Sequence, residues 1–83
     1  MARKDLINEI ADFCFAYGLF KKSVDVNNIK AGMEKQFDDV EFIEALIHML
    51  TTKTRIHKNI DIEKLKALLI ELEKIRLELE YKE

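Results

Sequence analysis

The fold is decided by residues 60–81, which read IDIEKLKALLIELEKIRLELEY. Leucines and isoleucines recur here at spacings of three and four residues, which is the pattern of an amphipathic α-helix with one apolar face. The apolar stripe consists of Leu65, Leu68, Leu72, Ile75 and Leu79, flanked by Ile62 and Leu69. Asp61 can cap the free N–H groups of the first turn. We therefore predict a helix over residues 61–81, a rod of roughly 30 Å at 1.5 Å per residue.

The composition of the whole chain favours further helices. Hydrophobic residues make up 48% and charged residues 36% of the 83 residues, which is typical of a globular protein with a charged exterior. The chain contains no proline, and its only glycines are Gly18 and Gly32. Because tight turns and long irregular loops depend on these two residue types, we predict an all-α fold with a single domain over residues 1–83.

Three shorter helices are predicted before the long one. They cover residues 5–17, 24–36 and 40–52. Gly18 stands where a left-handed C-terminal cap belongs, and Asp25 can cap the second helix. Asp38 or Asp39 can cap the third helix. Gly32 is either a weak point inside the second helix or the mark of a close helix–helix contact.

The segment TTKTRIHKN at residues 51–59 lacks a helical stripe and is predicted to be a loop. The halves of the chain also resemble each other, since residues 24–31 and 60–67 share an apolar-Asp-apolar start and a Lys-Ala pair at an offset of 36 residues. This match favours two antiparallel helical hairpins packed on the long C-terminal helix. The alternative is that any two amphipathic helices share such spacing.

Composition also bounds where the protein acts. One cysteine, Cys14, excludes an internal disulfide and fits a reducing compartment. The first residues lack the apolar segment of a signal peptide, and no apolar run reaches the roughly 18 residues that span a bilayer. We expect a cytoplasmic protein with no membrane contact.

Few residues suggest catalysis or metal binding. Cys14 lies in an apolar stripe, where a buried and inert thiol is expected. His48 and His57 lack the spacing of a helical zinc site, and one cysteine does not complete a structural one. The acidic residues between 38 and 44 lack the glycine turn of a calcium loop, and helix capping explains them. We expect no enzyme activity, no metal and no cofactor.

Basic residues gather in two segments between the predicted helices. An up-down topology would bring them to one end as a possible anion contact made by Lys21, Lys22, Lys53, Arg55, His57 and Lys58. The simpler interpretation is a solvated end with ordinary lysines. A nucleic-acid-associated regulator is the alternative function. The net charge of −2 and the acidic start of the third helix, Asp38-Asp39-Val40-Glu41, weigh against DNA.

The long helix favours a different function. It should overhang the shorter helices by at least one turn and leave Ile75 and Leu79 without cover. Ile70 and Leu77 are seven residues apart and point away from the main stripe. A second copy is the simplest cover, with an interface made by Ile70, Leu72, Ile75, Leu77 and Leu79. We expect a small non-enzymatic interaction or regulatory protein that acts through helix–helix contacts, as a homodimer or with another protein.

Overall fold

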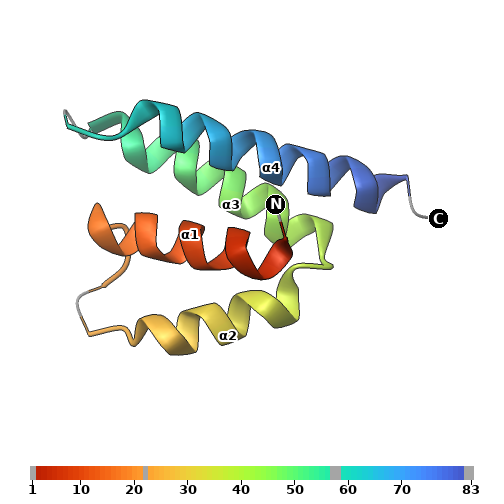
Figure 1. The fold of residues 1–83 in the computed structure, drawn as a ribbon, viewed down its shortest axis with the longest axis horizontal. Helices are drawn as coiled ribbons and strands as arrows, with labels where there is room; N and C mark the ends of the chain where they lie inside the picture. Colours follow the sequence, from red (N-terminus) through yellow and green to blue (C-terminus); the bar gives the residue numbers. More distant parts are fainter. Residues whose placement is uncertain (1, 22, 57–58, 82–83) are drawn as a thin grey trace. The chain divides into compact units, whose positions relative to one another are not determined.

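The computed structural model describes residues 2–21, 23–56 and 59–81, and these residues form helices and turns without a strand. The elements are α1 (Arg3–Ala16), α2 (Val26–Gln36), α3 (Val40–Lys53), the short 3₁₀ turn η1 (Thr54–Ile56) and α4 (Ile62–Glu80). Figure 1 shows them in chain order. The predicted all-α class is confirmed.

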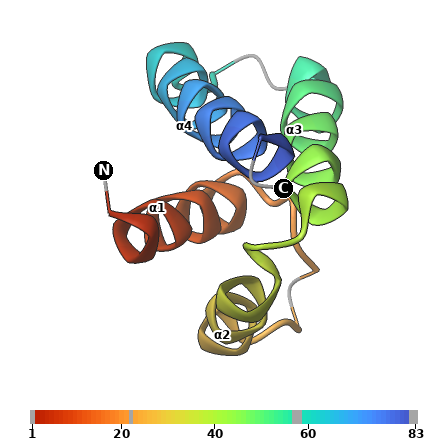
Figure 2. The ribbon, with the colours of Figure 1, turned by 90° about the vertical axis from the view of Figure 1, so that its right-hand side faces the viewer.

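The chain divides into two compact units, residues 1–36 and residues 37–83. In the first unit α1 packs against α2, and in the second α3 packs against α4. The two helices of each unit run in opposite directions (Figures 1 and 2). Each unit is thus a helical hairpin, as the internal similarity of the sequence predicts. The packing of the first hairpin on α4 stays a prediction.

Gly18 ends α1 as predicted. Its φ is +67°, a left-handed conformation that a glycine adopts without the steric cost of a Cβ. The turn lets the N–H of Leu19 donate to the carbonyl of Cys14 at 2.8 Å, so a carbonyl of the last helical turn is satisfied. The rings of Phe13 and Tyr17 lie 4.7 Å apart just before it. In the same unit, Lys30 of α2 forms an ion pair of 3.2 Å with Asp12 of α1.

Gly32 lies inside α2 and does not mark a close contact. A Cβ built on it meets no atom within 4 Å among the described residues. Of the two alternatives for Gly32, the close helix–helix contact is therefore not seen among the described residues. What remains is the intrinsic cost of a glycine in the middle of a helix.

Replacing Gly32 by alanine is expected to stabilise the protein by about 0.4–1 kcal/mol. Alanine lowers the entropy of the unfolded chain and fits the helical backbone, and the added methyl group has open space. Urea denaturation followed by circular dichroism measures the change. The matched control is Gly18→Ala, which is expected to destabilise because of its positive φ. A loss of stability in Gly32→Ala would contradict the open environment described above.

The C-terminal end of α3 differs from the prediction. Residues 51–53 are helical, and η1 continues the coil for one more turn, where a loop is expected from sequence. The hydroxyl groups of Thr51, Thr52 and Thr54 donate to carbonyls three or four residues earlier. These bonds satisfy backbone carbonyls in the last turns of α3. The helix therefore continues through residues 51–53 although the sequence has no apolar stripe there. At the other end, Asp39 and not Asp38 is the cap, since its carboxylate accepts from the N–H of Glu41 at 3.0 Å.

The long helix α4 agrees with the prediction to within a residue at each end. The carboxylate of Asp61 accepts from the N–H of Lys64 at 3.1 Å, and the helix spans 19 residues compared with 14 in α1 and α3. The apolar faces of the four predicted helices supply ten expected core residues, and seven of them are buried: Ile7, Ile10, Phe13, Ile43, Leu46, Leu68 and Leu72. The other three predicted core residues, Ile47, Leu65 and Leu69, keep partial exposure.

Candidate functional site

The side of α4 opposite its buried face carries apolar side chains among its charged ones. At about 100° per residue, Ile70, Leu77 and Tyr81 fall within about 40° of one another around the helix axis. All three lie roughly 140–180° from Leu72 on the buried face. We call the three residues, together with Ile62 at their edge, the outer stripe of α4.

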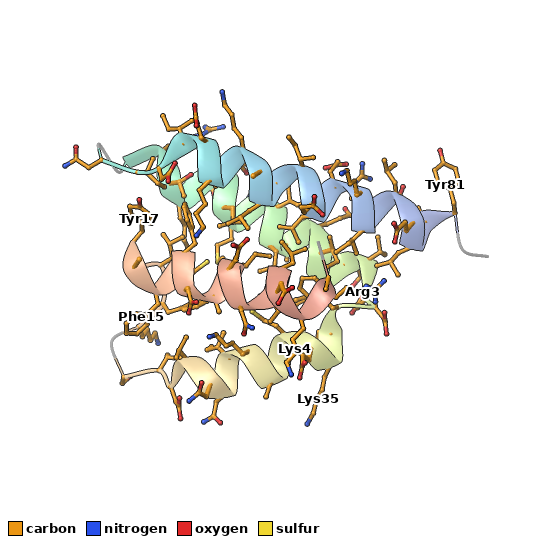
Figure 3. All side chains as sticks on the ribbon, viewed as in Figure 1. Arg3, Lys4, Phe15, Tyr17, Lys35 and Tyr81 are labelled. Carbon is orange, nitrogen blue, oxygen red and sulfur yellow. The ribbon has the colours of Figure 1, made fainter. Side chains whose placement is uncertain are left out.

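The outer stripe is exposed in a single chain. Exposed fractions are 57% for Ile70, 41% for Leu77 and 84% for Tyr81, and Ile62 is also exposed. Tyr81 projects from the end of α4 (Figure 3). Single exposed apolar side chains are ordinary, but several on one face of one helix form a patch that suits a protein contact.

Two members of the predicted interface do not lie on this surface. Ile75 has an exposed fraction of 7%, so the expectation that it lacks cover is wrong. Leu72 is fully buried, and its side chain belongs to the core. Leu79 keeps partial exposure. Of the five predicted interface residues, Ile70 and Leu77 have the free surface that a partner needs.

Charged side chains along α4 form a network beside the outer stripe. The guanidinium of Arg76 donates to the carboxylate of Glu73 through Nε at 2.6 Å and through Nη2, and to Glu80 through Nη1 at 2.9 Å. Hydrogen bonding to Glu73 raises the pKa of Arg76 above its ordinary value. Lys74 lies 3.6 Å from Glu71. These pairs follow the i,i+3 and i,i+4 geometry of one helix and stiffen the charged borders of the surface.

An apolar groove opens at the N-terminal end of α4. It has a volume of about 510 Å³ and is lined by Thr51, Thr54, Arg55, Ile60, Ile62, Leu65, Lys66 and Leu69. The hydroxyl of Thr54 is bonded to the carbonyl of Leu50, so this group turns away from ligands. Arg55 and Lys66 supply two positive charges to an otherwise mainly aliphatic lining. The groove shares Ile62 with the outer stripe.

A second hollow of about 390 Å³ lies between α3 and α4. Its lining consists of Glu44, Ile47, His48, Thr51, Glu73 and Arg76. Arg76 is the cation that could hold an anion there, but two carboxylates already occupy its donors. These donors of Arg76 are thus committed within the chain, and with Glu44 and Glu73 in the lining the hollow has no excess of positive charge.

The predicted anion contact is only partly described. Lys21 belongs to the first unit, and Lys53 and Arg55 belong to the second. Lys22, His57 and Lys58 lie outside the described residues. The predicted gathering of all six at one end stays a prediction.

The structure also locates Cys14 and the candidate metal ligands of the described residues. Cys14 is fully buried. Within residues 2–21, 23–56 and 59–81, no three His, Cys, Asp or Glu side chains come together as metal ligands. None of the helices seen in these residues has the length and apolarity to cross a membrane.

Sequence reasoning missed Ile62, Tyr81 and the groove. Ile62 is predicted on the flank of the buried stripe, and its angle around the axis, about 80° from both Leu72 and Ile70, is that of an edge position. The available signal for Tyr81 was the recurrence of apolar residues on the polar side of the helix at positions 70, 77 and 81. Comparison with protein-family models, curated proteins and solved structures finds no match to this chain.

Proposed function

We propose that this chain is a small, non-enzymatic, cytoplasmic interaction protein that acts through helix–helix contacts and pairs with a second copy of itself. The single observation that supports the proposal is the outer stripe, in which Ile70, Leu77 and Tyr81 lie exposed on the side of α4 opposite its buried face. Covering such a stripe removes apolar surface from water, which is the main favourable term in protein association.

The linear shape of the outer stripe favours a helix as the partner segment that covers it. The stripe follows the axis of a 19-residue helix, and Ile70 and Leu77 repeat at seven residues, the spacing at which a second helix packs along the first. Charged residues border the stripe on both sides, as they border the seam between paired helices. A second copy supplies such a helix with the same stripe, and twofold pairs are the commonest homo-oligomers.

The exposed area also bounds the strength of the contact. Specific stable interfaces bury about 800 Å² on each partner, and four exposed side chains along one helix supply less than that. We therefore expect dissociation in the micromolar range, with monomers and dimers in exchange. An apolar contact of this kind should be nearly insensitive to salt, whereas contact with nucleic-acid phosphates should weaken steeply as salt rises.

Sedimentation of the wild-type protein tests the proposal. Between low micromolar and submillimolar concentration, the mean mass is expected to rise from that of one chain toward that of two. Repeating the series at low and high salt is expected to give nearly the same dissociation constant. A protein that remains monomeric throughout the range would overturn the proposed self-association.

A further inference from the structure

We infer that the two copies pair antiparallel along α4, about a twofold axis between Glu73 and Lys74, so that the C-terminal turn of each α4 seats at the apolar groove of the other copy. This inference rests on the proposed function for the pairing itself. It adds the direction of the helices and a role for the groove lined by Ile62, Leu65 and Leu69.

One axis position pairs the two central residues of the outer stripe, Ile70 and Leu77, with each other. Ile70 and Leu77 lie at equal distances on either side of the midpoint between Glu73 and Lys74, so each Ile70 faces Leu77 of the other copy. Lys66 and Tyr81 are also equidistant from that midpoint, which places the ring of Tyr81 beside Lys66 of the other copy. The apolar contacts are thereby made twice, once on each side of the axis.

Charge decides between the two directions. Residues 62–70 hold two lysines and one glutamate, a net charge of +1. Residues 71–80 hold four glutamates, one lysine and one arginine, a net charge of −2. Antiparallel pairing sets each positive half against a negative half, and it also opposes the two helix dipoles. Parallel pairing keeps the seven-residue repeat but sets like charges and like dipole ends side by side.

The groove fits the segment that antiparallel pairing brings to it. Tyr81 of the partner lies level with Lys66, and Glu78 of the partner lies level with Leu69, and both Lys66 and Leu69 line the groove. The aliphatic lining suits an aromatic ring, and Arg55 and Lys66 can form ion pairs with carboxylates in the last turn of the partner's α4. Glu78 and Glu80 supply these carboxylates. Glu80 already accepts from Arg76 at 2.9 Å, and a carboxylate has room for further donors.

Cross-linking between two variants that each carry one added cysteine tests the direction. Lys66→Cys and Glu80→Cys replace exposed residues and leave the outer stripe intact. In the antiparallel pair these two positions face each other across the interface, while the two copies of residue 66 lie about 22 Å apart along the axis. A short bismaleimide should therefore join the two variants when they are mixed and join neither variant to itself. The wild type is the control for reaction at Cys14, which is buried.

Each outcome of the cross-linking bears on a different statement. A mixed product at least tenfold more abundant than either self-product supports the antiparallel pair. Self-products of Lys66→Cys and of Glu80→Cys in equal or greater yield would overturn the inferred direction and leave the proposed pairing in place. Absence of any product, with only monomers in sedimentation, would overturn the pairing and the inference together.

The role of the groove has its own variant. Tyr81→Ser is expected to raise the dissociation constant about tenfold, because a tyrosine in a pocket commonly dominates a small interface. Phe15→Ser is the matched control, since Phe15 is an exposed aromatic residue of the first unit and lies outside α4. It is expected to leave the constant unchanged. Equal constants for Tyr81→Ser and wild type would overturn the seating of Tyr81 at the groove.

Discussion

Replacing Leu68 by alanine is expected to lower the free energy of unfolding by about 2–5 kcal/mol. Leu68 lies in the middle of α4 with an exposed fraction of 1%, so the substitution removes buried apolar surface and leaves a cavity. Alanine has a helix propensity at least as high as that of leucine, so the loss of stability measures the loss of core packing. Denaturant titration of the wild type and the variant measures it. Small domains have about 5–15 kcal/mol in total, so this single change removes a large share of the stability.

The matched control uses the same substitution on the same helix. Leu77→Ala changes a residue on the opposite face with an exposed fraction of 41%. Its effect on unfolding is expected to stay below about 1 kcal/mol when the protein is diluted below its association range. Equal losses for Leu68→Ala and Leu77→Ala would contradict the assignment of a buried and an outer face to α4.

Helix boundaries could be predicted from the sequence where a single local residue determines them. Gly18 has the positive φ expected of a C-terminal cap. Asp25 and Asp61 accept hydrogen bonds from the backbone of the first turn that follows each of them. Such caps depend on a few neighbouring atoms, and a sequence contains all the information needed to place them.

The segment after Leu50 could not be predicted in this way. Residues 51–53 lack apolar periodicity, and three threonines in a short run suggested an irregular loop. In the structure the threonine hydroxyls bond to the preceding turn, and the helical coil continues through η1. A threonine hydroxyl can either compete with the backbone hydrogen bonds of a helix or add to them. Which of the two happens depends on whether the preceding turn of the helix is already formed.

The sequence predicts on which side of α4 the candidate surface lies, but not which residues belong to it. The position of Ile70 and Leu77 opposite the main stripe follows from 3.6 residues per turn, and both residues are exposed. The overhang argument failed for Ile75, because the length of a helix does not determine which side chains are covered along it. The groove near Ile62 is formed by η1, α3 and α4 together, and no periodicity in the sequence encodes such a hollow.

Placing glutamates at Ile70 and Leu77 together is expected to weaken self-association by at least 100-fold. The twofold pair would then bury four carboxylates along its seam, and an unpaired charge is costly to remove from water. The monomer should keep its fold, because both positions are exposed and glutamate is a good helix former. Phe15→Glu is the control for an added charge on an exposed apolar residue elsewhere, and it is expected to pair as the wild type does. Sedimentation of the wild type, the double variant and Phe15→Glu at equal concentration measures the change in self-association. A double variant that pairs as tightly as the wild type would exclude the outer stripe of α4 as the interface.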